Sequence, residues 1–321
     1  MRLDKTILKI VSNNRFSSIL DNKKLYVFCF HSVGDNPSKF TSINNLNISK
    51  SSFKKIVNYL LENFTIESPA SYNLFDNISA CAKPRALITF DDGFDDAFKN
   101  GISYLIERRI PVLMFLNMKN IIYPNIPLIS AASQYLSTID YFKDYKSEFN
   151  YLKCNPDTLD LSKLPFNVTK SILEFQGKLI DKSTLEHYLK SEYLYIGNHF
   201  YEHWNAKALT DQQIVLNFNL NHTILSTYDN YNGDFAFTNG LVHSCWNFKQ
   251  YELIKELGAS RIFSANGGLF NNGILIDRIS LSIEDVDPNN LYYKIFKSKF
   301  RDFFLANYLH INKFFNKKTN L

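Results

Sequence analysis

The sequence predicts an α/β protein whose parallel strands form either a barrel or an open, doubly wound sheet. Short apolar runs rich in β-forming residues alternate with segments of helical periodicity along most of the chain. The clearest unit is a strand at 86–90, a helix at 94–109 and a strand at 111–117, a spacing that indicates a parallel pair. No GxGxxG motif follows the first strand and no GxxxxGK(S/T) motif occurs, so the nucleotide-binding versions of these folds lose support.

The remaining elements follow in a regular order. A buried strand at 25–31 opens the series, and a helix at 51–63 follows with Ser49 as its N-cap. Polar and aromatic residues dominate 123–189, whose pattern is mostly helical, and we interpret this stretch as a helical insertion. The later elements are strands at 193–197, 234–237, 260–264 and 274–281 and helices at 210–227 and 248–257.

Composition narrows the class of protein. The chain has 321 residues, of which 45% are apolar, so it can bury a large core. Its net charge of +5 is spread too evenly to indicate nucleic acid, although it could favour an acidic glycan or an anionic membrane. The four cysteines form no close pair, and residues 1–20 lack the continuous apolar segment of a signal peptide. We therefore expect a reduced, cytoplasmic protein.

Two adjacent carboxylates end the strand at 86–90. Asp91 and Asp92 would repel each other there unless a cation or a proton lies between them. Alternation at a strand end can point the two in different directions, so that one binds a metal ion while the other faces a substrate. Gly93 lets the chain turn sharply behind them. A turn that caps a helix explains the pair equally well, because aspartate is favoured there.

Two histidines four residues apart follow the strand at 193–197. A spacing of four predicts that His199 and His203 lie on one face of a single helical turn, where both can bind the same metal ion. Such a pair can also arise by chance. Together with Glu202 it spells HxxEH, the inverted zinc-protease motif, but that motif belongs inside a long helix. One carboxylate and two imidazoles would make a three-ligand catalytic zinc set, with a second carboxylate as base.

At this point the chain resembles the polysaccharide deacetylase family (carbohydrate esterase family four). The similarity covers roughly 25–281. It lies in FHSV at 30–33, TFDDG at 89–93, IGNH at 196–199 with the HxxxH pair, FAFTNG at 235–240 and IDRI at 276–279.

The resemblance implies a distorted (β/α) barrel with its active site at the carboxyl ends of the strands. By that resemblance Asp91 is the catalytic base, while Asp92, His199 and His203 hold one divalent metal ion, zinc being the first choice. The implied activity is hydrolysis of an N-acetyl or other small acyl group on a sugar.

The segment 235–240 is similar to the family's FAYPYG segment, which lines the sugar pocket and places a backbone N–H near the oxyanion. Phe237, Asn239 and Gly240 are therefore candidate substrate-binding residues. Thr238 and Asn239 stand where the family usually has Pro-Tyr, so the resemblance does not fix the substrate preference.

Two of the family's functional residues have no direct match. No arginine precedes Phe235 to pair with the catalytic aspartate, and Arg278 is the candidate replacement, although an ordinary surface arginine is an equal alternative. The late leucine-histidine motif that supplies a general acid is also missing. His31 and His243 are the available histidines, and a structural role is the simpler interpretation of each.

We divide the chain into an N-terminal extension (1–24), a barrel with its insertion (25–290) and a basic, aromatic C-terminal helix (291–321). In the last segment, phenylalanines at 296, 300, 303 and 304 fall on one helical face among many lysines. Such a helix either lies in the membrane interface, attracted by anionic lipids, or packs its phenylalanines on the barrel. Both interpretations remain open.

The predicted function is a metal-dependent carbohydrate deacetylase of surface polysaccharide or lipopolysaccharide biosynthesis. Its substrate would be an acetylated sugar on a nucleotide or lipid carrier, met in the cytoplasm or at the inner membrane surface. A catalytically decayed, glycan-binding barrel is the first alternative. The changed FAFTNG segment favours it, and four intact chemical positions oppose it. An inverted zinc protease is the second, and it leaves Asp91 without a role.

Overall fold

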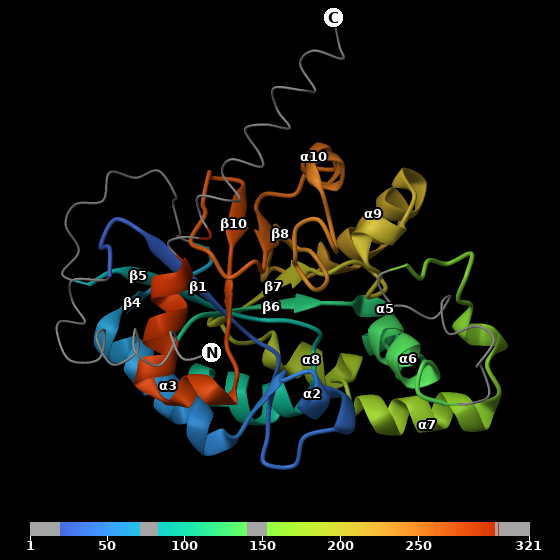
Figure 1. Ribbon diagram of the computed structural model, residues 1–321, viewed down its shortest axis with the longest axis horizontal. Coiled ribbons are helices and arrows are strands. Elements are labelled where there is room, and N and C mark those ends of the chain that lie inside the picture. Colours follow the sequence, from blue (N-terminus) through green and yellow to red (C-terminus); the bar gives the residue numbers. More distant parts are fainter. Residues whose placement is uncertain (1–19, 71–82, 140–152, 299–300, 302–321) are drawn as a thin grey trace, which may run out of the picture.

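A parallel sheet curls into a nearly closed barrel in the computed structural model, which describes residues 20–70, 83–139, 153–298 and 301 (Figure 1). The strand order is β10-β9-β8-β7-β6-β5-β1-β11. Their bounds are β1 Leu25–Phe30, β5 Arg85–Phe90, β6 Val112–Leu116, β7 Leu194–Asn198, β8 Tyr231–Ala236, β9 Ile262–Ser264, β10 Leu275–Asp277 and β11 Ile279–Ser280. The predicted barrel is therefore confirmed, and the open sheet is not.

A single residue joins the two ends of this strand path. β10 ends at Asp277 and β11 begins at Ile279, so only Arg278 separates the strand that pairs with β9 from the strand that pairs with β1. The seam of the barrel thus lies at Arg278, whose side chain is buried. Short strands flank the main path: β4 (Thr65–Ile66) pairs with β5, and β2 (Ser32–Val33) pairs with β3 (Asn47–Ile48).

Helices cover the outside of the barrel (Figure 1). They are α2 Lys39–Ile43, α3 Lys50–Asn63, a π-helix Ala97–Ile102 that continues as α4 Ser103–Glu107, α5 Met118–Ile122, α6 Ile129–Leu136, α7 Phe166–Gln176, α8 Lys182–Tyr188, α9 Asp211–Leu225 and α10 Phe248–Glu256. Single 3-10 turns occupy Leu161–Lys163, Ala206–Ala208 and Ile283–Val286. Within the interpreted insertion 123–189, the described residues contain α6, α7 and α8, while 140–152 lies outside the described residues.

The apolar runs of the strands are continuous because both faces of the sheet are covered. Every residue of β1 and β6 is buried. Alternate side chains point into the barrel, where Val27, Leu87, Leu113 and Phe115 belong to one apolar cluster. The opposite set packs against the surrounding helices. The inward-facing rows of β1 and β5 lead directly to the residues that follow these strands.

The chain termini are described only in part. Residues 1–19 of the predicted extension and residues 299–300 and 302–321 of the predicted C-terminal helix lie outside the described residues. The helix begins at 288, earlier than expected, and Leu291 and Ile295 are buried in the main core. The first turns of this helix therefore pack on the barrel. Among the described residues, none of the helices is long and apolar enough to span a bilayer.

Candidate active site

The two aspartates that follow β5 point in different directions. Asp91 continues the inward-facing row of the strand, beyond Leu87 and Thr89, and is 4% exposed. Asp92 has a positive φ of 73°, and Gly93 follows with 87°. An aspartate whose backbone lies in the left-handed region is strained, and the surrounding structure must hold it there. Such strained residues are frequent at functional sites. The turn carries the Asp92 carboxylate away from Asp91 and towards the loop after β7.

Arg278 binds both oxygens of Asp91. Its Nη1 and Nη2 donate to Oδ1 and Oδ2 at 2.7 and 2.8 Å, and its Nε donates to the carbonyl of Ser264 at 3.1 Å. The guanidinium carbon also lies 5.2 Å from the centre of the Phe115 ring. The contact expected from the sequence is present. The alternative of a surface arginine is wrong, because the closing strands place this side chain inside the barrel.

This pair controls the protonation of Asp91. Burial raises the pKa of a carboxyl group, but the Arg278 guanidinium, which binds both carboxylate oxygens, outweighs burial, so the pKa of Asp91 lies below its usual range. Asp91 is therefore ionised at neutral pH. Its carboxylate is available as a proton acceptor, although it is almost completely buried.

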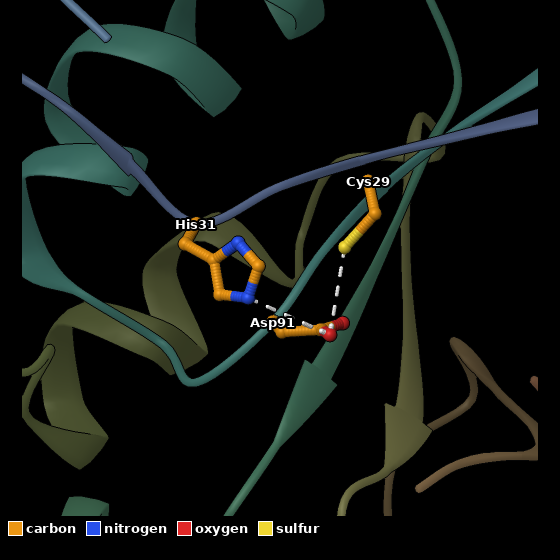
Figure 2. Close-up of side chains that lie close together, drawn as sticks. All are labelled: Cys29, His31 and Asp91. Atoms are coloured by element: carbon orange, nitrogen blue, oxygen red, sulfur yellow. Dashed lines mark hydrogen bonds and ion pairs between the residues drawn. The ribbon is translucent and has the colours of Figure 1, made fainter. Parts of the chain in front are cut away.

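Cys29 and His31 approach the same carboxylate from β1 and the residue after it (Figure 2). The Cys29 thiol donates to Asp91 Oδ2 at 3.5 Å, and His31 Nε2 lies 3.9 Å from that oxygen. Burial raises the pKa of Cys29 and lowers the pKa of His31. At neutral pH the thiol is therefore protonated and the imidazole is uncharged.

The spacing of Cys29, His31 and Asp91 would also permit a metal ion. Two observations oppose that interpretation. Both oxygens of Asp91 already accept from Arg278, whose positive charge would repel a cation. The Cys29 thiol already donates to Asp91 Oδ2 and to the carbonyl of Phe30, so its hydrogen-bonding partners are supplied by the protein. We therefore interpret this group as the surroundings of a base.

Asp92, His199 and His203 form a second group, and it suits a metal ion. Asp92 Oδ1 lies 3.6 Å from His199 Nε2 and 3.1 Å from His203 Nε2. This oxygen is buried and accepts no hydrogen bond within the described part of the chain. Two ligands of a tetrahedral zinc ion with bonds of 2.0–2.1 Å lie about 3.4 Å apart. The donor types and their separations both fit such an ion, and all three residues are buried.

A backbone hydrogen bond fixes the orientation of His199. Its Nδ1 lies 2.8 Å from the carbonyl oxygen of Ala236, at the end of β8. Because a carbonyl only accepts, Nδ1 donates to Ala236, and Nε2 is the ring nitrogen left to face Asp92 and a metal ion. This arrangement is the usual outer support of a metal-binding imidazole.

The helical turn predicted for 199–203 is wrong. The residues after β7 form an irregular loop, in which Phe200 has a positive φ of 60°. The two imidazoles still converge, because the change of direction at Phe200 brings His203 back beside His199. Their ring centres lie 5.1 Å apart. The HxxEH protease interpretation loses its structural basis, since it needs both histidines on a helix.

Buried asparagine side chains hold this loop. Asn117 donates to the carbonyls of His199 and Phe200, and Asn198 Oδ1 accepts from the Phe200 N–H at 2.9 Å. Asn221, from α9, donates to Asn198 Oδ1 and to the Leu116 carbonyl, each at 2.8 Å, and accepts from the Met118 N–H. We call Asn117, Asn198 and Asn221 the asparagine clasp. It satisfies backbone groups that a regular helix would have satisfied internally.

Comparison with solved structures decides the fold. The Streptococcus pyogenes deacetylase PplD, solved in complex with acetate, aligns over 85% of this chain and 98% of its own, with a TM-score of 0.58 and 13% identity. The chain has the polysaccharide deacetylase fold. IcaB from Ammonifex degensii aligns over 85% of this chain and 97% of its own (TM-score 0.54, 14% identity). The Bacillus cereus polysaccharide deacetylase BC0361 aligns over 83% of this chain and 68% of its own, with a TM-score of 0.54 and 12% identity. No protein-family model and no curated protein matches the sequence.

The other predicted site residues of this deacetylase fold differ in their placement. Phe237 is fully buried, and its ring stacks on Trp246 with centres 5.0 Å apart. Asn239 is exposed with a φ of 58°, and Gly240 is buried with its carbonyl bound to the Trp246 indole. Phe237 is thus a core residue rather than a pocket wall. His243 is exposed, unlike the residues around Asp91.

Sequence reasoning missed Cys29 and the asparagine clasp. The alternation of β1 places Cys29 on the inward-facing row that leads to His31, and this pattern is the signal in the sequence that points to it. In the sequence, these asparagines do not stand out, because asparagine is abundant along the whole chain. Their partners are backbone groups up to 105 positions away in sequence, and no local pattern identifies such partners.

Proposed function

We propose that the protein is a metal-dependent hydrolase that removes an N-acetyl group from a sugar. The observation that carries the proposal is the juxtaposition of two groups at the carboxyl end of the barrel. Asp92, His199 and His203 are arranged as ligands for one ion, and the adjacent Asp91 is an ionised carboxylate held by Arg278. When bound, a divalent ion such as Zn²⁺ would polarise the acetyl carbonyl and acidify a water molecule.

The side chains around Asp91 supply the proton transfers of this hydrolysis. Asp91 accepts a proton from the attacking water, and Arg278 keeps the carboxylate ionised and oriented. His31, uncharged and 3.9 Å from the base, accepts that proton and donates it to the departing sugar nitrogen. A backbone N–H near Gly240 would face the oxyanion. The products are acetate and the free amino sugar.

The proposal extends to the biological setting. We propose that the reaction belongs to surface polysaccharide or lipopolysaccharide biosynthesis, in the cytoplasm or at the inner membrane surface. The acetylated sugar would be carried by a nucleotide, a lipid or a growing glycan. The basic residues after 298 would provide the membrane contact. Flotation with anionic liposomes tests that contact, by comparing the full chain with one that ends at 298. If the two chains float equally, or if neither floats, the proposed membrane contact is wrong.

Metal analysis and acetate release test the activity together. The purified protein should bind about one equivalent of zinc or a similar ion and should release acetate from N-acetylated oligosaccharides. A protein that binds the glycan and the ion without releasing acetate from any acetylated substrate would instead be a glycan-binding barrel.

A further inference from the structure

The loop that follows β9 wraps around the seam of the barrel. We call residues 264–270 the seam loop. The Arg278 side chain donates from Nε to the Ser264 carbonyl at 3.1 Å, and the Arg278 carbonyl accepts from the Gly267 N–H at 3.0 Å. The seam loop therefore contacts the partner of the proposed base through both its side chain and its backbone.

The carboxylate of Asp277 holds the first half of the seam loop. Its Oδ1 accepts from the Ser264 hydroxyl at 2.8 Å and from the Asn266 N–H at 2.7 Å. Its Oδ2 accepts from the Gly268 N–H at 2.7 Å, and the side chain is 2% exposed. Because a backbone N–H points at each oxygen, both oxygens must act as acceptors. A carboxylate meets this demand, whereas a side-chain amide does not.

The seam loop also holds the segment that follows β8. The Ala265 N–H donates to the Gly240 carbonyl at 2.9 Å, and Asn266 Oδ1 accepts from the Val242 N–H at 2.8 Å. A Cβ on Gly240 would lie 2.6 Å from the backbone nitrogen of Ala265, so the two backbones are in close contact. This segment is the one whose N–H is proposed to face the oxyanion. Through a single loop, Asp277 thus reaches both sides of the proposed chemistry.

A second buried aspartate has contacts of a different kind. Asp234 of β8 is paired with Arg261, which also donates to the Pro69 carbonyl at 2.9 Å. Arg261 precedes β9, at the end of the barrel opposite to the candidate active site. This pair therefore closes the far end of the barrel, whereas the contacts of Asp277 lead to the site. Burial alone does not distinguish the two aspartates, but their partners do.

We propose that Asp277 is a positioning residue of the candidate active site. Through the seam loop it fixes both the guanidinium that orients Asp91 and the segment that supplies the oxyanion N–H. The inference rests on the proposed function and adds a residue to its machinery. Asp277 itself contacts neither the ion nor the substrate. It acts through Arg278 and Gly240, so its loss should displace these groups and leave the metal ligands in place.

Asp277→Asn tests the role in the zinc-loaded full chain, assayed well below its Tm. The amide group turns an NH₂ towards one of the backbone N–H donors, which loosens the seam loop. The kcat for acetate release from an N-acetylated tetrasaccharide should fall by about 10–100-fold, the scale of a displacement near 1 Å. KM and zinc content should stay near their wild-type values, because the lost interactions strengthen only in the transition state.

Asp234→Asn is the matched control. It also removes a buried carboxylate, and it leaves Arg261 without its countercharge, so the Tm should fall. The kcat of the folded protein should nevertheless remain that of the wild type. A merely structural role for Asp277 would give the two variants the same behaviour.

Asn266→Ala is a milder second variant, and it decides the matter if Asp277→Asn does not fold. It removes the side-chain contact to the Val242 N–H from a half-buried position. Its kcat should fall about fivefold, on the scale of one hydrogen bond, with little change in Tm.

The outcomes separate this inference from the proposed hydrolysis. Wild-type kcat in Asn266→Ala and in folded Asp277→Asn, or an equal loss of kcat in Asp234→Asn, would overturn the positioning role and leave the hydrolysis intact. No acetate release by the zinc-loaded wild type would instead overturn the proposed hydrolysis, and the positioning role with it.

Discussion

Asp91 and Asp92 are neighbours in sequence, yet their surroundings give them separate chemistry. Arg278 binds both oxygens of Asp91, whereas Oδ1 of Asp92 faces two imidazole nitrogens and accepts no hydrogen bond in the described part of the chain. The positive φ of Asp92 turns the two carboxylates apart. The first is therefore suited to proton transfer and the second to metal binding.

Asp91→Asn should separate these roles. The amide cannot accept the proton, so kcat should fall by about 10²–10⁴, the usual contribution of a general base. The metal ligands are unchanged, so zinc content measured by elemental analysis should remain near that of the wild type. The matched variant Asp92→Asn should lose zinc as well as activity. Loss of zinc in Asp91→Asn would mean that Asp91 is itself a ligand.

Arg278→Gln should be strongly destabilising. It leaves the Asp91 carboxylate buried without a countercharge, and breaking a buried pair in this way costs about 3–5 kcal/mol. Urea denaturation of the metal-free protein measures the change in the free energy of unfolding. The double variant with Asp91→Asn should recover part of the loss, because the uncompensated charge is gone. Additive effects of the two substitutions would contradict a direct pairing.

At the scale of elements, the loop after β7 shows where sequence reasoning succeeded and failed. The sequence predicts the strand and both histidines, because an apolar run and a four-residue spacing are local signals. The conformation of the loop itself is not predictable in this way, because it depends on asparagine side chains from distant elements. Asn117 lies directly after β6, and Asn221 belongs to α9. A four-residue spacing predicts a helix only when the loop lacks such partners.

Asn221→Asp tests whether the asparagine clasp serves metal binding. The substitution is nearly isosteric. It removes the two hydrogen bonds that the Asn221 amide donates to the Leu116 carbonyl and to Asn198 Oδ1, and it places a carboxylate oxygen against these two oxygens instead. Zinc affinity, measured by competition with a chelating dye well below the unfolding temperature, should weaken by about 10–100-fold. Asn219→Asp, on the exposed side of the same helix, should bind zinc normally. Wild-type affinity in Asn221→Asp would reduce the clasp to a packing role.

At the scale of the whole molecule, the order of elements could be predicted and the closure of the barrel could not. Buried parallel strands have apolar runs that stand out in the sequence. The seam depends on two strands of three and two residues on either side of Arg278, which are too short to give a pattern of their own. The sequence predicted one strand at 274–281 there. The break matters because it turns Arg278 inward to meet Asp91.

Removal of the metal should lower the stability of the whole barrel. An ion that binds only the folded chain adds about 2.7 kcal/mol when its free concentration is one hundred times its Kd. Zinc at that excess should therefore raise the Tm by several degrees over the chelated protein, as followed by circular dichroism. His203→Ala should show no such shift. A zinc-dependent Tm in that variant would place the ion elsewhere.

Acetate release from an N-acetylated tetrasaccharide tests the central claim most directly. The assay compares the chelated protein, the same protein reloaded with one equivalent of zinc, and reloaded Asp91→Asn. The account predicts acetate from the reloaded wild type only, together with one new free amine for each acetate. Equal release by the chelated and reloaded proteins, or full release by Asp91→Asn, would contradict a metal-dependent deacetylase built on these residues.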